Sequence, residues 1–425
     1  MERKIEQFFQ KWKDDKLGKP LVIYGSKQIG KTFSVLNFGK KAYKNVVYFN
    51  TDNNTELEDL FRREKIIDKI IVSLSLLSGE TILKEDTLII FDNLVSNNIA
   101  KGIKLFGSDK SKYNIIAITS RRDKLAEFKG EELQFKSMNE LDFEEYLWAI
   151  GEKNLADLIR ASFDNRKTCS FHKVALNLFQ EYLITGGLPE VIFALLDGKT
   201  PYEIDAIKQK ILDIYKKEIA LNDNLIDIPR GLEVINSIPS QLKKENKKFQ
   251  YGKIGVGRRA KEYEGSINFL VNNQIVYRSY KIRDVKSPLS SYKEVDRFKL
   301  YLPDDGILFS MLHMNKRQLE TDENLKETLY ENHIAKTLVE SGYSLFYYQS
   351  EGKAEVNFVI QNRLGKIIPI ELTTKINSKA KSLSVFLKKY DAEEAYRITE
   401  NNFSTRKDVR YLPIYAVFCL NTSKM

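Results

Sequence analysis

One octapeptide near the start of the chain constrains the fold more than any other feature. Residues 25–32 follow an apolar run at 21–24 and precede a helix-like stretch at 32–41. When a strand is followed by a glycine-rich turn and then a helix, the backbone N–H groups of the turn can surround a phosphate. The dipole at the N-terminus of the helix then favours the negative charge of that phosphate. The sequence predicts a phosphate-binding loop formed by Gly25, Ser26, Lys27, Gln28, Ile29, Gly30, Lys31 and Thr32. We expect Lys31 to reach the β- and γ-phosphates of ATP and the Thr32 hydroxyl to bind Mg²⁺.

Continuous apolar runs recur at 46–50, 87–92 and 114–119, with helical stretches between them at 56–63 and 94–106. Continuous runs of this kind are typical of strands buried on both faces of a parallel sheet. The sequence therefore predicts an α/β fold with a P-loop NTPase core over residues 1–138.

Four residues at the carboxyl ends of these strands are candidates for chemistry. Asp92 ends the third strand and is predicted to hold Mg²⁺, with a helix cap as the alternative. Asn93 stands where many such ATPases have Glu, and an amide can orient water but cannot accept its proton. Thr119 and Ser120 end the fourth strand, where a hydroxyl senses the γ-phosphate or positions water. These residues predict nucleotide binding with weakened hydrolysis.

Two arginines, Arg121 and Arg122, follow the fourth strand directly. Either is a candidate for a phosphate-directed arginine, acting in the same chain or toward a neighbouring subunit. A solvated loop pair is an equally good interpretation.

Three further segments follow the core. Residues 139–225 carry apolar residues at helical spacing in stretches at 142–150, 154–162, 173–184 and 202–221, which predicts a helical lid. Residues 226–318 predict a mixed module, with a helix starting at 238–242, another at 258–272 and a strand at 274–280. Residues 319–425 predict the order α–β–β–β–α–β of a restriction-endonuclease-like domain, with its last strand at 412–420.

Positive charge is concentrated in the mixed module. The net charge of the chain is +10, and residues 241–300 hold 15 Lys and Arg against 6 Asp and Glu. Helices, a hairpin and this charge fit a winged helix that binds a polyanion, with a solvated lysine-rich surface as the alternative. The predicted phosphate contacts are Lys243, Lys244, Lys247, Lys248, Arg258, Arg259 and Lys261.

Composition sets the broad class. The chain of 425 residues is 42% hydrophobic, and its length suggests about three domains. No stretch approaches the roughly 20 apolar residues that a membrane helix needs, and the first residues lack an apolar signal core. Two cysteines without metal-type spacing and three scattered histidines argue against disulfides and zinc. We therefore expect a cytoplasmic protein without a membrane partner.

Several separate motifs in the same order give a resemblance over nearly the whole chain. They are the loop at 25–32, 88–92, Leu-Asp-Phe-Glu-Glu-Tyr-Leu at 141–147, Gly-Gly-Leu-Pro-Glu at 186–190, 238–242, 247–249, 298–302, 305–306 and 355–358. The chain resembles AAA-type ATP-binding proteins that carry a C-terminal domain of unknown function similar to PD-(D/E)XK nucleases. The resemblance implies that the Gly187–Pro189 segment lies near the nucleotide, with Pro189 among the contacts.

The same resemblance indicates a degenerate nuclease site. Such sites use an acid and then Glu-x-Lys on the next strand to hold Mg²⁺ and activate water. Here the corresponding positions are Asn357, Glu371 and Thr373, and Glu331 remains on the preceding helix. Lys375, two residues late, is a candidate for a migrated lysine.

Three functions follow as hypotheses. The first is a slow ATPase whose nucleotide state controls binding to a nucleic acid, DNA in particular, or to a protein partner. The second is a non-hydrolysing, nucleotide-stabilised scaffold, which Asn93 favours. The third, an active nuclease, is disfavoured by Asn357 and Thr373. The sequence leaves the oligomeric state open.

Overall fold

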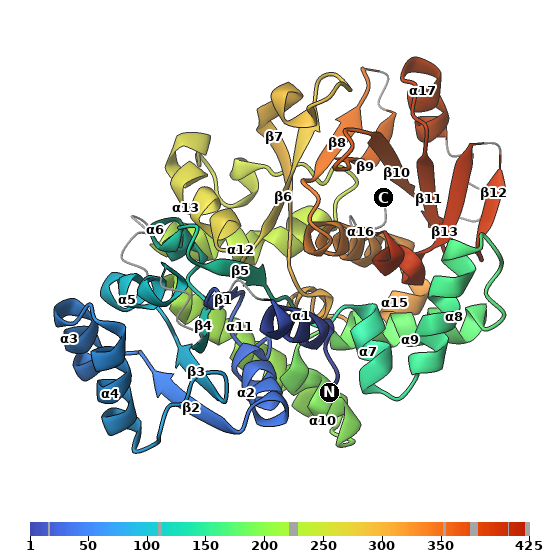
Figure 1. Cartoon of the computed structure of the whole chain (residues 1–425). Coiled ribbons are helices and arrows are strands. Elements are labelled where there is room, and N and C mark those ends of the chain that lie inside the picture. The colour runs from blue at the N-terminus through green and yellow to red at the C-terminus, as the bar shows by residue number, and fades with distance from the viewer. Residues whose placement is uncertain are drawn as a thin grey trace. The chain divides into compact units, whose positions relative to one another are not determined.

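The computed structural model describes residues 1–15, 18–108, 113–220, 228–351, 354–374, 381–406 and 408–420. The chain, drawn in Figure 1, divides into two compact units. Unit 1 comprises residues 1–140 together with 272–274, and unit 2 comprises residues 141–271 and 275–425. The sequence predicts four segments, and their status as separate domains stays a prediction.

Unit 1 alternates strands and helices. Its elements are α1 (Lys4–Asp14), β1 (Leu21–Tyr24), α2 (Lys31–Ala42), β2 (Asn45–Asn50), α3 (Thr55–Arg63), α4 (Ile67–Ser78), β3 (Thr87–Asp92), α5 (Asn97–Ser108), β4 (Asn114–Thr119), η1 (Arg122–Lys124), α6 (Leu125–Phe128) and β5 (Gln134–Ser137). The strands form one sheet in the order β2-β3-β4-β1-β5, and every pair is parallel. This confirms the predicted α/β core. The sequence does not predict β5, because Phe135 is its only apolar residue.

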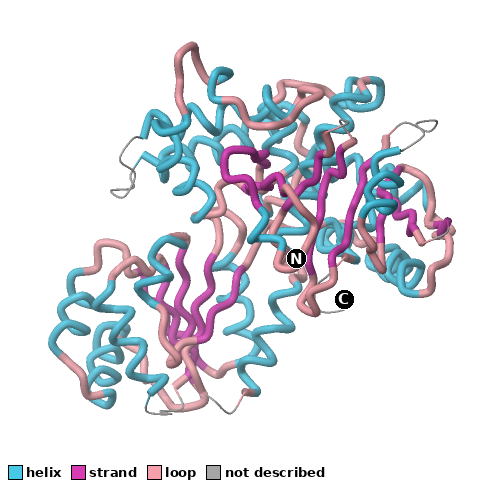
Figure 2. Tube along the Cα trace, turned by 90° about the horizontal axis from the view of Figure 1, so that it is seen from above, coloured by secondary structure: helices cyan, strands magenta, loops and turns pink. Residues whose placement is uncertain are grey.

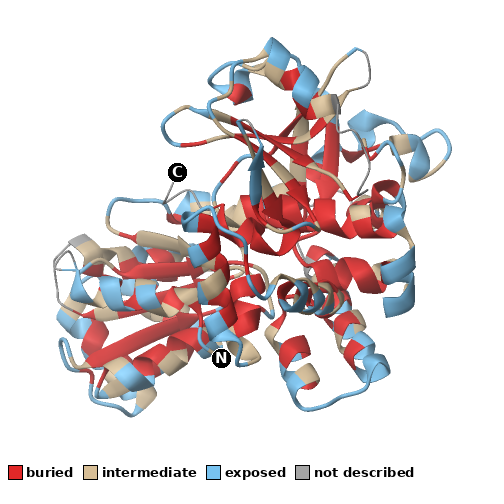
Figure 3. Ribbon diagram, turned by 90° about the vertical axis from the view of Figure 1, so that its right-hand side faces the viewer, coloured by how far each residue is buried: buried red, intermediate tan, exposed pale blue. Residues whose placement is uncertain are grey.

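The core of unit 1 explains why its strands are continuously apolar. All six residues of β3 are buried (Figure 3), and Phe91 packs edge-on against Phe61 of α3 at 5.7 Å between ring centroids. On α2, a Cβ added to Gly39 would lie 3.0 Å from the side chains of Leu88 and Val46. Glycine therefore lets α2 approach the sheet closely, and β3 is covered on both faces.

Unit 2 begins with helices and continues into a sheet (Figure 2). Its first elements are α7 (Phe143–Ala149), α8 (Lys153–Asp164), α9 (His172–Thr185), α10 (Pro189–Leu196), α11 (Pro201–Ala220), α12 (Ile228–Leu242), η2 (Tyr251–Lys253) and α13 (Ala260–Asn272). Local signals fix several of these ends. Asp142 and Glu145 form a capping box at the start of α7, and Pro189 occupies the first turn of α10.

The remaining elements of unit 2 build a mixed sheet. They are β6 (Tyr277–Ile282), η3 (Leu289–Tyr292), β7 (Lys293–Tyr301), α14 (Asp305–Met311), α15 (Lys316–Thr321), α16 (Glu323–Glu340), β8 (Phe346–Gln349), β9 (Glu355–Gln361), β10 (Ile367–Leu372), α17 (Lys381–Lys389), β11 (Ala395–Thr399), β12 (Ser404–Arg406), β13 (Val409–Pro413) and η4 (Ile414–Cys419). The eight strands follow the order β12-β13-β11-β10-β9-β8-β6-β7. Helix α16 packs on β6, β7 and β10, and α17 packs on β9 and β10.

This sheet crosses a predicted boundary. The sequence separates a basic module at 226–318 from a C-terminal domain at 319–425, whereas β6 of the first segment pairs in parallel with β8 of the second. The hairpin of β6 and β7 is therefore one edge of the C-terminal sheet. Side chains on this hairpin consequently reach the interior of the C-terminal segment.

Two predicted elements are wrong. Residues 238–242 end α12 instead of starting a helix, because Val234, Ile235 and Ile238 are buried at helical spacing and extend the helix toward its N-terminus. The final strand predicted at 412–420 stops at Pro413, and Ile414–Cys419 form a buried 3₁₀ helix. A short apolar run does not distinguish a buried strand from a buried helix.

Candidate functional site

The predicted phosphate loop has the backbone that an anion site needs. Gln28 and Gly30 have positive φ angles of 63° and 88°, and α2 starts at Lys31. Two left-handed residues so close together turn successive peptide N–H groups inward at a helix N-terminus. The Lys31 amine is buried and donates hydrogen bonds to the carbonyls of Gly25 (2.9 Å) and Ser26 (2.6 Å). The loop and its lysine therefore form one preorganised unit.

Gly25 is required for a steric reason. A Cβ at this position would lie 2.1 Å from the carbonyl oxygen of Met138. Met138 in turn donates its N–H to the Tyr24 carbonyl at 2.9 Å. The start of the loop is therefore held tightly between the end of β1 and the residue after β5.

Asp92 lies directly beside the loop. Its carboxylate accepts hydrogen bonds from the Thr32 hydroxyl (2.7 Å), the Tyr48 hydroxyl (2.9 Å) and the Asn93 N–H (2.8 Å). Partial burial and the bond to Asp92 raise the pKa of Tyr48 to about 12, so this hydroxyl stays a donor. All three donors are neutral, so the negative charge of Asp92 is not balanced by them. The structure thus joins the two predicted Mg²⁺ ligands, Thr32 and Asp92.

Asn93 takes a left-handed conformation, with φ of 57°. Its amide donates to the Asn50 side chain at 3.1 Å, and its carbonyl accepts from the Thr51 hydroxyl at 2.9 Å. Asn tolerates this conformation better than most residues. The side chain is exposed at the carboxyl edge of the sheet, where it can hydrogen-bond water but carries no basic group.

Strand β4 lies beside β3 and parallel to it, which brings Thr119 to the same edge of the sheet as Asp92. Thr119 is buried, and its hydroxyl accepts the Arg121 N–H at 3.0 Å, so it shapes the turn that carries Ser120. The Arg121 guanidinium is bound to Asp123 by two hydrogen bonds of 2.8 and 2.9 Å. Arg122 instead stacks 5.1 Å above the Tyr24 ring, directly before the phosphate loop. Of the two arginines, Arg122 is the one that lies against β1.

Unit 2 contains a second carboxylate centre, around Glu331 of α16. Glu331 is 1% exposed and accepts hydrogen bonds from Lys247 (2.8 Å), Lys299 (3.0 Å) and the Tyr301 hydroxyl (2.7 Å). Asn357 donates to the same carboxylate at 3.1 Å. The structure therefore unites two residues of the predicted degenerate nuclease site, and adds two lysines to them.

Electrostatics keep this cluster ionised. Burial raises the pKa of Glu331, but the ammonium groups of Lys247 and Lys299 outweigh it and hold that pKa well below its usual range. Burial lowers the pKa of Lys299, but Glu331 and Glu355 outweigh it and raise that pKa. The two ammonium groups occupy the space beside Glu331 in which a metal ion would need to bind.

Lys247 corrects one predicted contact. The sequence places it on a nucleic-acid surface, whereas its side chain is 3% exposed and pairs with Glu327 and Glu331. A buried, paired ammonium cannot reach a phosphate backbone. Lys299 of strand β7 and Lys247 of the loop after α12 are both buried in the interior. A count of charges along the sequence does not reveal this burial.

The other six basic candidates remain accessible. Lys243, Arg258, Arg259 and Lys261 are exposed, and Lys244 and Lys248 are half-buried. Arg258 forms a surface ion pair with Glu233 at 3.2 Å. Partial burial and the neighbouring Lys253 lower the pKa of Lys244, which shows that like charges gather here.

Glu371 is bound separately from Glu331. Its carboxylate accepts bonds from the Arg397 Nε (2.8 Å) and the Leu383 N–H (3.0 Å). Thr373 follows β10 and donates its N–H to Ile398. Glu331 and Glu371 are both buried, and each is held by its own set of partners. Lys375 lies outside the described residues. Within the described ranges, no group of three or more His, Cys, Asp or Glu is arranged to hold a metal ion.

The comparisons with known proteins agree with the geometry of unit 1. Residues 17–147 match the family model of an AAA domain. This segment is therefore an AAA-type domain, and its function is that of a nucleotide-binding, ATPase-like domain.

Unit 2 has less informative matches. Residues 176–318 and 326–417 match models of two domains of unknown function, DUF8612 and DUF4143. No curated protein matches the chain. A solved Walker-type ATPase of Pyrococcus abyssi is similar at 11% identity and a TM-score of 0.44, over 74% of this chain and 96% of that one. A likeness this low carries no argument about function. None of the described helices is long and apolar enough to span a membrane.

The Gly-Gly-Leu-Pro segment has a structural explanation within unit 2. Gly187 donates its N–H to Asp304 at 2.7 Å, and its carbonyl accepts the Leu141 N–H at 2.8 Å. A Cβ on Gly186 would meet the Asp304 carboxylate at 2.3 Å. The two glycines are therefore needed for close packing, and contact between Pro189 and the nucleotide stays a prediction.

A buried ionic network continues from this segment. Lys336 donates to the Tyr182 hydroxyl (2.8 Å) and lies 3.6 Å from Asp305, which also pairs with His333 at 2.9 Å. Burial raises the pKa of Asp305, but Lys336 and His333 outweigh it and lower that pKa. These residues fix α16 against α9 and α14, and thereby position Glu331.

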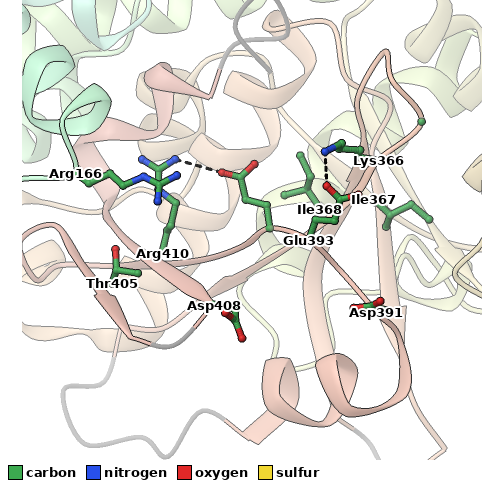
Figure 4. Close-up of a pocket in the computed structure, with 11 residues that line it drawn as sticks. Arg166, Lys366, Ile367, Ile368, Asp391, Glu393, Thr405, Asp408 and Arg410 are labelled. Carbon is green, nitrogen blue, oxygen red and sulfur yellow. Dashed lines mark hydrogen bonds and ion pairs between the residues drawn. The ribbon is translucent and has the colours of Figure 1, made fainter.

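Unit 2 also holds a pocket of about 580 Å³ near β10, β11 and β13 (Figure 4). Its wall carries both signs of charge, and they are largely paired within the pocket: Lys366 with Glu393, and Arg410 with Glu394. The lining has three basic side chains, Arg166, Lys366 and Arg410, and four acidic ones, Asp391, Glu393, Glu394 and Asp408, so its formal charge is −1 and mostly paired, which gives little basis for proposing a charged ligand. Sequence reasoning predicts nothing here, because the lining comes from five separate segments.

Sequence reasoning also missed residues that contribute to the two centres, among them Tyr48, Asn50, Lys299 and Tyr301. For Lys299 a signal was available, since a lysine between Phe298 and Leu300 stands within an apolar strand. Tyr48 and Asn50 alternate along β2 and need the strand order before they can be placed beside Asp92.

Proposed function

We propose that the chain binds Mg²⁺-ATP at the phosphate loop and hydrolyses it slowly. The contact between the Thr32 hydroxyl and the Asp92 carboxylate carries this proposal, because it brings together two hard oxygen ligands directly beside the loop. These residues fit a magnesium ion, which would neutralise phosphate charge during transfer. Lys31 would leave the Gly25 and Ser26 carbonyls for the β- and γ-phosphates.

Slow turnover follows from Asn93. Removing a general base typically costs about 10²–10⁴-fold in rate. Asn93 donates a hydrogen bond to Asn50 at the edge of the sheet, and neither amide can accept a proton from an attacking water. This same observation favours the second candidate, a nucleotide-stabilised scaffold without hydrolysis.

The decisive experiment is calorimetric titration with ATP and Mg²⁺. Lys31→Ala should abolish measurable binding, because it removes the one side-chain cation of the loop aimed at the phosphates. Lys40→Ala is the matched control, since it removes an exposed cation near the C-terminal end of α2, away from the loop. Unchanged ATP affinity in folded Lys31→Ala would overturn the assignment of the phosphate loop.

We further propose that the accessible basic residues of the 226–318 segment bind nucleic acid, DNA in particular, with an acidic protein surface as the alternative partner. The supporting observations are the proximity of Lys244 to Lys253 and the exposure of Lys243, Arg258 and Arg259 in the same segment. Nucleotide state would then control this binding. A nuclease function has no support, because lysines occupy the Glu331 centre.

Salt dependence tests the nucleic-acid proposal. Affinity for duplex DNA should fall with salt at a log–log slope near −0.9 per phosphate neutralised. Reversing Lys243 and Lys248 to Glu should weaken binding to all sequences and flatten the slope. Lys173→Glu, an exposed lysine on α9, is the control. Absence of DNA and RNA binding at low salt would favour the protein partner.

A further inference from the structure

A residue far from the phosphate loop in sequence supports the loop from outside. Arg3 precedes α1 and is 6% exposed. Its guanidinium donates one hydrogen bond to the Ile29 carbonyl at 3.0 Å and another to the Asn139 carbonyl at 2.7 Å. The planar fork of arginine is suited to holding two acceptors at once. All three residues belong to unit 1.

The contact with Ile29 acts on the part of the loop that faces a phosphate. Ile29 stands between Gln28 and Gly30, the two residues with positive φ. In a planar trans peptide the C=O and N–H groups point in opposite directions. A cation that holds the Ile29 carbonyl on the outside therefore fixes the Gly30 N–H toward the inside. The positive charge also polarises this peptide and strengthens the N–H as a donor.

The contact with Asn139 anchors the arginine. Asn139 follows Met138, whose carbonyl packs against Gly25 and whose N–H binds Tyr24. Arg3 therefore connects the middle of the loop to the segment that supports its start. With one carbonyl fixed by the sheet edge, the guanidinium cannot rotate freely, and the Ile29 peptide is held in one orientation.

We propose that Arg3 is a positioning residue for phosphate binding, which acts by fixing the Ile29–Gly30 peptide. This inference rests on the proposed function. Arg3 also lines a pocket of about 600 Å³ with Phe33 and Asn37 of α2. Contact with a nucleoside in that pocket is a competing explanation, so the test must separate the phosphate chain from the nucleoside.

The test compares ATP with inorganic tripolyphosphate by calorimetry, in the full chain. Arg3→Met should lower the affinity for ATP and the affinity for tripolyphosphate by the same factor, about tenfold or more. A loss of this size is expected when a hydrogen bond from a charged group is removed. Lys11→Met removes an exposed cation from α1, the helix that follows Arg3, and should change neither affinity. Arg3→Lys keeps the charge without the fork and should give an intermediate loss for both ligands, which covers the case that Arg3→Met does not fold.

Each other outcome has a distinct meaning. Unchanged affinities in folded Arg3→Met, with ATP bound by the wild type, would overturn this inference alone. A loss for ATP without a loss for tripolyphosphate would overturn it in favour of nucleoside contact. Wild-type protein that binds neither ligand would overturn the proposed function itself.

Discussion

Two buried carboxylates, Asp92 in unit 1 and Glu331 in unit 2, differ in what surrounds them. Asp92 accepts hydrogen bonds from two hydroxyls and a backbone N–H, all neutral. Glu331 accepts from one hydroxyl, one amide and two ammonium groups. The negative charge of a carboxylate with neutral partners can still attract a cation. The charge of a carboxylate bound to two lysines is already balanced by their ammonium groups. The chain therefore carries one centre suited to a metal ion and one closed to it.

The largest effect is expected when the closed centre loses its charge. Glu331→Gln leaves Lys247 and Lys299 buried without their shared partner, and breaking a buried pair typically costs about 3–5 kcal/mol. Chemical denaturation should show this loss in the free energy of unfolding. Glu327→Gln removes the 42%-exposed partner of Lys247 and should cost about 1 kcal/mol or less. Equal effects from both variants would show that the cluster is not structural.

A smaller effect is expected at the open centre. Asn93→Glu should raise ATP turnover by about tenfold or more, because it supplies a general base. Asn93 has a positive φ, which Glu adopts at some cost. Asn93→Gln is the matched control, since it has the same strain and no base. Wild-type turnover should lie well below about 10 s⁻¹. A fast wild-type rate that Asn93→Glu leaves unchanged would mean that another residue supplies the base.

The two centres also differ in how far sequence predicts them. The phosphate loop is contiguous, and Asp92 follows a continuous apolar run, so local pattern and strand order suffice to place them together. The Glu331 centre needs Lys247 and Lys299, which lie 84 and 32 residues away and come from a segment whose charge suggests a surface. Composition counts these lysines but cannot show that they are buried. Arg3 likewise gives no local signal, because its acceptors are backbone carbonyls 26 and 136 residues away.

The predicted fold succeeds and fails for similar reasons. The apolar runs at 87–92 and 114–119 predict β3 and β4 correctly, and both strands are almost wholly buried. The run at 412–420 is equally apolar but ends in a 3₁₀ helix, since burial on all sides suits either structure. The pairing of β6 with β8 joins residues that are far apart in the sequence, and it cannot be predicted from the local pattern of either strand.

Binding of Mn²⁺, a spectroscopic substitute for Mg²⁺, tests the contrast between the two centres most directly. Electron paramagnetic resonance titration should show tight Mn²⁺ binding only when ATP is present, and Asp92→Asn should weaken it while the protein remains folded. Without ATP, the wild type should bind no Mn²⁺ tightly and should not cleave plasmid or single-stranded DNA. Tight Mn²⁺ binding without nucleotide that survives Asp92→Asn, together with DNA cleavage that disappears in Glu371→Ala, would contradict the account.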